Sequence, residues 1–315
     1  MKALRNLLAV LLVVAGPVFA EPGKEALEAY TKGYNLVVAG RYEEAIPHLT
    51  RAAELYPDYV GAFVNRATCY LKLGQYEKAL ADTDSCLKLS PDFPLVHRQR
   101  GLALSALKRH DEALKEAQAA VDLDPKDWEN HAALGSALSD LGKYKEAIAA
   151  IDAAVRLEPR KSGGHVFIRG FARYMLNEME AAAKDFRQVP DLMGWKDPTS
   201  AYGALFGYFT LLRTGHAKEA QELLKAAGKN VSREAWPGPV IACLLGDMKE
   251  DDLKRLAGDP GQELEMHAYL GLARLQDGKK DAARAHFLKA KEIGKTEFFE
   301  YQVSVLELKR LDAKK

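Results

Sequence analysis

Ser85 and Lys88 form the pattern Ser-x-x-Lys, in which a lysine stands close enough to activate a serine nucleophile. The motif lies late in a segment patterned as a helix, and Cys86 within it takes a position that related segments fill with alanine. We therefore interpret it as a chance match, since four-residue motifs recur by chance. The sequence contains no His-Glu-x-x-His, Gly-x-Ser-x-Gly, phosphate-binding glycine loop or Cys-x-x-Cys.

Histidines and cysteines offer little more chemistry. The eight histidines are scattered, with no two at metal-ligand spacing on one helix. Cys69 and Cys86 could form a disulfide in an oxidising compartment, or could be small buried hydrophobic residues, as could Cys243. The sequence predicts no catalytic residue, no metal site and no cofactor. As an enzyme, the chain would need a pocket with converging polar groups, and Trp195, Trp236 and His267 are the candidates.

The main feature of the sequence is a set of residue types that recur at a fixed interval, rather than a catalytic motif. Apolar residues between the recurring marks follow helical spacing. Small residues at fixed positions would let two helices approach closely, and a proline would stop the second helix of each pair. Three sets of residues recur at intervals of 34: Pro57, Pro91, Pro125 and Pro159; Ala45, Ala79, Ala113 and Ala147; Gly33, Ala67, Gly101 and Gly135.

This 34-residue period of helix pairs resembles the tetratricopeptide repeat (TPR). The resemblance implies an all-α, right-handed solenoid of helix pairs with a C-terminal capping helix. We predict four regular repeats in residues 21–159 and two degenerate repeats in 160–230. A connector with short helices follows in 231–262, and 263–315 form a last repeat with its capping helix. We also expect breaker-rich loops at Val189–Ser200 and Ala226–Pro239.

In TPR proteins the first helix of each pair lines a concave groove. By that resemblance, the partner-binding residues of this chain are Tyr30, Tyr34, Val38, Leu71, Phe167, Phe171 and Tyr174. Aromatic residues contribute much of the binding energy at protein interfaces. Two alternatives stay open: the chain's own C-terminal helices could cover these residues, or a second copy could bind them in a homodimer.

The N-terminus predicts export. Lys2 and Arg5 precede an apolar run from Leu7 to Ala15, and small residues follow up to Ala20. This is the pattern of a secretory signal peptide spanning residues 1–20, cleaved after Ala20. We expect a periplasmic protein with no membrane-spanning segment after cleavage. The net charge of +1 favours neither nucleic acid nor an acidic membrane surface as a partner.

Residues 235 to 311, which include the sequence AWPGPVIACLLGD, loosely resemble NlpI-type bacterial envelope TPR proteins. Those proteins act as adaptors that bring proteases and cell-wall hydrolases to their substrates. The resemblance implies a non-catalytic adaptor or scaffold that binds other proteins in the cell envelope. The alternatives are an accessory subunit of an envelope enzyme, such as a protease or cell-wall hydrolase complex, and a self-associating structural protein.

Overall fold

The computed structural model describes residues 21–313, which form 17 helices and no strand. The predicted signal peptide, residues 1–20, lies outside the described residues. The chain divides into two compact units, one ending at Leu123 and one beginning at Asp124. We call them the N-terminal and C-terminal units. None of the helices between residues 21 and 313 has the length and apolar run that crossing a bilayer requires.

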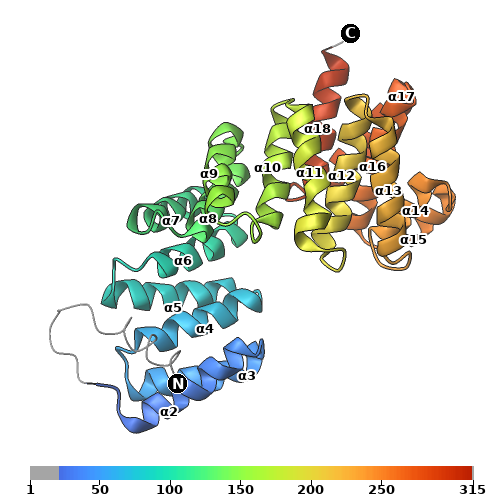
Figure 1. The fold of residues 1–315 in the computed structure, drawn as a ribbon. Helices are drawn as coiled ribbons and strands as arrows, with labels where there is room; N and C mark the ends of the chain where they lie inside the picture. The colour runs from blue at the N-terminus through green and yellow to red at the C-terminus, as the bar shows by residue number, and fades with distance from the viewer. Residues whose placement is uncertain (1–20, 314–315) are drawn as a thin grey trace. The chain divides into compact units, whose positions relative to one another are not determined.

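The N-terminal unit contains three helix pairs, and in each pair the two helices pack against each other (Figure 1). Each pair matches one of the first three predicted repeats, so the split between units falls between the third and the fourth. The helices are α2 (Lys24–Val38), α3 (Tyr42–Leu55), α4 (Val60–Lys72), α5 (Tyr76–Leu89), α6 (Pro94–Ala106) and α7 (His110–Leu123).

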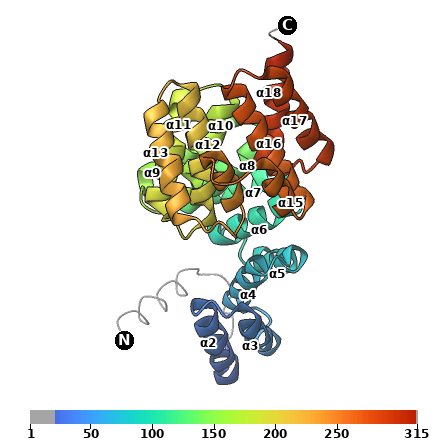
Figure 2. The ribbon, with the colours of Figure 1, turned by 90° about the vertical axis from the view of Figure 1, so that its right-hand side faces the viewer.

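The C-terminal unit contains five further pairs and a final helix (Figure 2). They are α8 (Trp128–Asp140), α9 (Tyr144–Leu157), α10 (Gly163–Met175), α11 (Met179–Met193), α12 (Pro198–Arg213), α13 (Ala217–Asn230), α14 (Gly238–Leu245), α15 (Glu250–Leu256), α16 (Pro260–Gln276), α17 (Lys280–Ile293) and α18 (Phe299–Asp312). The two predicted loops were partly wrong, because α11 continues through Pro190 and α13 continues to Asn230.

Small residues hold the two helices of a pair close together, as their spacing predicts. The four alanines of the repeat are buried, with at most 1% of their surface exposed. A Cβ atom added to Gly33 would lie 2.6 Å from Cγ of Leu49, and one added to Gly135 would lie 2.4 Å from Cγ1 of Ile151. A larger side chain at either glycine would therefore push its pair apart, which overpacks the core.

The turn inside each regular pair uses a left-handed residue. Gly40, Gly74 and Gly142 have φ angles between +69° and +73°, a conformation that costs glycine little and other residues about 1 kcal/mol. In the third repeat Lys108 takes the same position with φ of +60°. In one of the four regular repeats, the fold therefore holds a lysine in a left-handed backbone conformation that favours glycine.

Replacing Lys108 with glycine should stabilise the N-terminal unit by ~0.5–1 kcal/mol, because the left-handed strain is relieved. Native-state hydrogen exchange of the α6 and α7 amides would measure the gain. Lys115→Gly, in the interior of α7, should instead destabilise the unit by about 1 kcal/mol. Faster exchange in Lys108→Gly than in the wild type would contradict the prediction.

Ion pairs with the same spacing link the helices of three pairs. Arg66 binds Asp82, Arg100 binds Glu116 and Arg169 binds Asp185, each across 16 residues. Arg66 and Arg169 each donate from both Nε and Nη2 to their carboxylate, at 2.6–2.9 Å. This two-point geometry fixes the rotation of one helix against the other. The 16-residue spacing is visible in the sequence, but the repeat pattern by itself does not predict these ion pairs.

Helix α18 packs against α16 and α17, and also reaches back along the chain to α10 (Figure 1). It therefore lies on the face formed by first helices of the C-terminal unit. The predicted capping helix covers the inner face of its unit as well as ending the stack.

Candidate functional site

The predicted partner-binding residues of the N-terminal unit lie on a partly open surface. Tyr30, Tyr34 and Val38 follow one another at helical spacing along a single face of α2, and Leu27 extends that face by one further residue. Leu27 is 49% exposed and Val38 is 70% exposed, while both tyrosines are partly exposed. Leu71, on α4, is also partly exposed. We call these five residues the open face.

Tyr30 anchors the open face to the helices beside it. Its ring lies 4.7 Å from that of Tyr59 and 6.0 Å from that of Tyr34, centroid to centroid. The Nδ2 group of Asn65 donates a hydrogen bond of 3.2 Å to the Tyr30 hydroxyl. Burial, reinforced by Tyr34, raises the pKa of Tyr30. Tyr30 is therefore partly a packing residue, whereas Tyr34 and Val38 have more freedom to contact a partner.

The three predicted residues of the C-terminal unit have a different environment. Phe167, Phe171 and Tyr174 are buried, at 5%, 1% and 2% exposure. The Phe299 ring, at the start of α18, lies 5.3 Å from that of Phe167 and 4.5 Å from that of Phe171. The Tyr174 hydroxyl donates a 2.8 Å hydrogen bond to Oε1 of Glu307, also on α18. These three residues are core residues beneath α18, so this structure leaves them inaccessible to a partner.

A buried cluster of acidic and aromatic residues lies where α16 meets α18. The Trp236 indole donates to Glu265 at 2.6 Å, and the Tyr269 hydroxyl donates to Glu300 at 2.6 Å. Both carboxyl groups line a cavity of about 540 Å³. Burial first, and then the charge of Glu300, raise the pKa of Glu265 to about 8. Burial likewise raises the pKa of Glu300. At neutral pH the cluster therefore keeps Glu265 largely protonated.

This raised pKa makes the stability of the C-terminal unit depend on pH. A carboxyl group with a folded-state pKa above its unfolded value stabilises fully at low pH and loses this contribution as pH rises through the folded pKa. We expect the melting temperature to fall between about pH 5 and pH 9, and Glu265→Gln to flatten that fall. Tryptophan fluorescence can follow it, because Trp128, Trp195 and Trp236 all lie in this unit.

The matched control for this pH dependence is Glu263→Gln, which neutralises an exposed carboxylate on the same helix, α16. Its melting temperature should follow the wild-type pH profile. If melting temperature fell with pH equally steeply in wild type and in Glu265→Gln, Glu265 would ionise normally in the folded unit.

The residues considered for an enzyme site have separate partners. Trp236 binds Glu265, while Nδ1 of His267 lies 2.9 Å from Nδ1 of His286. Burial, followed by repulsion between the two rings if both were charged, lowers the pKa of His267 to about 4. Burial also lowers the pKa of His286, so both rings are largely neutral at pH 7. Trp195 packs at the edge of the core. Between residues 21 and 313, no group of three or more side chains is arranged to hold a metal ion.

The three cysteines are free thiols. Cys69 and Cys86 are fully buried, and they pack in two different small hydrophobic clusters. Burial raises the pKa of both thiols, to about 11 for Cys69 and about 12 for Cys86. Both therefore act as small core residues with little thiolate at neutral pH.

Comparison with known families agrees with this architecture. A family model described as tetratricopeptide repeat matches residues 36–98. A second model, the N-terminal TPR repeats region of Psidin, matches residues 69–178. Together the two matches run from residue 36, in the last turn of α2, to residue 178, just after α10.

Solved structures extend the likeness over the rest of the chain. A tetratricopeptide repeat protein from Parabacteroides merdae shares 16% identity at a TM-score of 0.56, covering 90% of this chain and 99% of its own. Pseudomonas aeruginosa pilF shares 18% sequence identity at a TM-score of 0.57, covering 71% of this chain and 97% of its own. PilW, a type IV pilus biogenesis factor, shares 17% sequence identity at a TM-score of 0.58, covering 66% of this chain and 94% of its own.

The chain therefore has an all-α solenoid fold built from tetratricopeptide repeats. Proteins of this class are generally scaffolds for protein interaction, because stacked helix pairs present extended concave surfaces. At identities below 20%, these likenesses give the fold, and the partner has to be inferred from this chain's own surface.

Proposed function

We propose that this protein is a non-catalytic scaffold that binds a helix of a partner protein on the open face of its N-terminal unit. The observation that carries the proposal is the contrast between the two units. In the C-terminal unit, aromatic residues of the first helix α10 contact α18. In the N-terminal unit, residues at equivalent repeat positions remain partly exposed.

Helix α18 shows what kind of segment such a face accepts. It places Phe299 against Phe167 and Phe171, and places Glu307 against Tyr174. Docking of a partner helix through its apolar face is a common mode of peptide recognition. We infer that a partner would offer an apolar stripe to Tyr34 and Val38, with aromatic contacts supplying most of the affinity.

We further propose that the scaffold acts in a bacterial periplasm. The signal-peptide pattern of residues 1–20 supports export, and the loose resemblance of residues 235–311 to NlpI-type proteins supports an envelope adaptor. An accessory role in an envelope protease or cell-wall hydrolase complex is compatible with the same surface. A homodimer through the open face is the alternative in which the partner is a second copy.

The test is site-specific crosslinking. A photo-crosslinking residue at Tyr34 would be compared with the same residue at Leu256, an apolar position 50% exposed in the C-terminal unit. We expect protein adducts from envelope extract at position 34 only, and their loss when Val38→Ser is added. Val38 is 70% exposed, so this substitution should change stability by less than about 0.5 kcal/mol.

Three outcomes separate the alternatives. Adducts with another protein would support the scaffold, while adducts containing only this chain would support the homodimer. Equal adducts at positions 34 and 256 would mean that the open face has no specific partner.

A further inference from the structure

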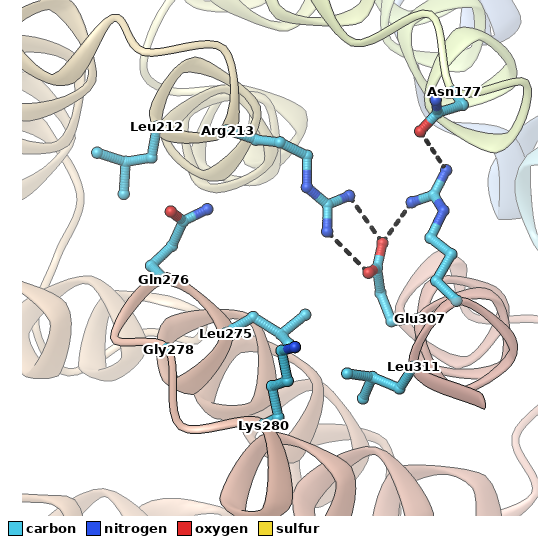
Figure 3. Close-up of a pocket in the computed structure, with 10 residues that line it drawn as sticks. Asn177, Leu212, Arg213, Leu275, Gln276, Gly278, Lys280, Glu307 and Leu311 are labelled. Atoms are coloured by element: carbon cyan, nitrogen blue, oxygen red, sulfur yellow. Dashed lines mark hydrogen bonds and ion pairs between the residues drawn. The ribbon is translucent and has the colours of Figure 1, made fainter. Parts of the chain in front are cut away.

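A second cavity of the C-terminal unit has an excess of positive charge. It has a volume of about 620 Å³, within the usual range of ligand pockets. It lies where α12, α16 and α18 end and α17 begins. Figure 3 shows Arg213 and Lys280 directed into the same space, with leucine side chains around it. Its charged lining residues are Arg213, Lys280, Arg310 and Glu307.

One of these charges is neutralised within the protein. Glu307, with a side chain only 2% exposed, accepts hydrogen bonds from Arg213 at 2.7 and 2.9 Å, from Tyr174 at 2.8 Å and from Arg310. Burial alone would raise the pKa of Glu307, but these hydrogen bonds and charges outweigh burial and lower it. Glu307 therefore stays ionised and balances one of the three cations.

The remaining positive charge has no acidic partner within the cavity. Lys280 has no ion-pair partner among residues 21–313, and the Arg213 and Arg310 side chains keep 28% and 22% of their surface exposed. Among the neighbouring acidic residues, Asp277 pairs with Lys279 and Asp312 pairs with Arg284. Asp281, which follows Lys280 in the first turn of α17, does not line the cavity.

The C-terminal ends of α12, α16 and α18 carry negative partial charge, which offsets these cations only in part. The carbonyl groups of Leu212 and Leu275, in the last turns of α12 and α16, already accept hydrogen bonds from Gly215 and Gly278. The cavity also adjoins the N-terminus of α17, which adds positive partial charge and carries Asp281 in its first turn, outside the cavity lining. Two uncompensated cations beside such an end make an anion the complementary ligand.

The apolar part of the lining restricts which anion fits. Leu212, Leu275 and Leu311 border the cavity beside the charged groups. We propose that the cavity binds a carboxylate carried on a short apolar group, with Lys280, Arg213 and Arg310 facing the carboxylate and the leucines facing the apolar group. A small organic acid and the free C-terminus of a peptide share this chemistry. The peptide source rests on the scaffold function proposed above, whereas the small-acid source does not.

Titration of the full chain with defined ligands tests the proposal. Leucine methyl NMR signals report locally, because three leucines line the cavity. The probes are hexanoate, the peptide acetyl-Ala-Ala-Leu with a free carboxylate, the same peptide as its C-terminal amide, and inorganic phosphate. We expect at least one of the two carboxylates to bind with an affinity about ten-fold or more above that of the amide and of phosphate.

Lys280→Gln and Lys279→Gln form a matched pair of variants. Both lysines are exposed, but Lys280 lines the cavity and Lys279 pairs with Asp277 outside it. Lys280→Gln should weaken carboxylate binding about three- to ten-fold, and Lys279→Gln should leave it unchanged. Neither exposed substitution should alter folding, which the tryptophan fluorescence of this unit would verify.

Each outcome either supports or overturns the site. Binding of hexanoate alone identifies a small acid as the ligand class, and tight binding of the peptide acid identifies a chain terminus. Equal binding of acid and amide, phosphate binding as tight as the acids, or unchanged affinity in Lys280→Gln would overturn the proposal. Crosslinking at Tyr34 probes the other unit, so failure of the scaffold function and failure of this site are distinguishable.

Discussion

Replacing Phe171 with alanine lowers the free energy of unfolding of the C-terminal unit by about 3–5 kcal/mol, the usual cost of emptying a buried phenylalanine site. Phe171 is 1% exposed and packs against Phe299 at 4.5 Å and Tyr144 at 6.1 Å, between ring centroids. Its loss leaves a cavity between α10 and α18. Guanidinium denaturation followed by tryptophan fluorescence measures the change.

The control for Phe171→Ala is Leu288→Ala, an apolar truncation at a site 39% exposed on α17. That variant should lose less than about 1 kcal/mol, since little surface is buried there. A loss of this small size in Phe171→Ala would place Phe171 on an open groove, with α18 displaced in solution. The same result would reopen the sequence-based assignment of Phe171 to partner binding.

Replacing Asp185 with alanine should destabilise the C-terminal unit by about 3 kcal/mol. The Asp185 carboxylate is 1% exposed and accepts hydrogen bonds from Arg169 at 2.6 and 2.9 Å and from Arg173 at 2.7 Å. Removing the acid leaves two guanidinium groups short of a partner, and breaking a buried ion pair from one side costs ~3–5 kcal/mol. We expect the lower end because Asp152 still binds Arg169 at 2.6 Å.

Asp152→Ala is the natural comparison for Asp185→Ala. It removes the other carboxylate that Arg169 contacts, but this one is 35% exposed, so water can replace much of the interaction. Its cost should stay near or below 1 kcal/mol. Equal losses in the two variants would indicate that burial of Asp185 is not what makes the pair important. The measurement is again denaturant unfolding monitored by tryptophan.

The burial of Phe171 and its neighbours also determines where partner binding should be tested. Substitutions at Phe167, Phe171 or Tyr174 would disturb the core beneath α18, and a lost partner would then be confounded with lost folding. Tyr34 and Val38 are free of that problem because they are at least partly exposed on the first helix.

Local chemistry explains why so much of the fold was predictable. Small residues, left-handed turns and helix-stopping prolines act on their immediate neighbours, so their 34-residue spacing located the helix pairs from α2 to α9. Helix α10, which begins at Gly163, lies at the start of the region 160–230 predicted to hold two degenerate repeats. The predicted loop is wrong at Val189–Met193, where the helix-breaking tendency of proline does not decide the structure. Val189 and Pro190 are buried in the last turns of α11, and that packing outweighs the local preference.

The sequence by itself therefore determined the repeat, the all-α class and the apolar inner face of each first helix. Only the tertiary structure decided which part of that face is open. Helical periodicity shows that Phe171 and Tyr174 point to the same side as Tyr34, but says nothing of what covers them. The covering helix comes from far along the chain: Tyr174 and its partner Glu307 are 133 residues apart. A contact at that separation leaves no local pattern, because it depends on how successive repeats stack.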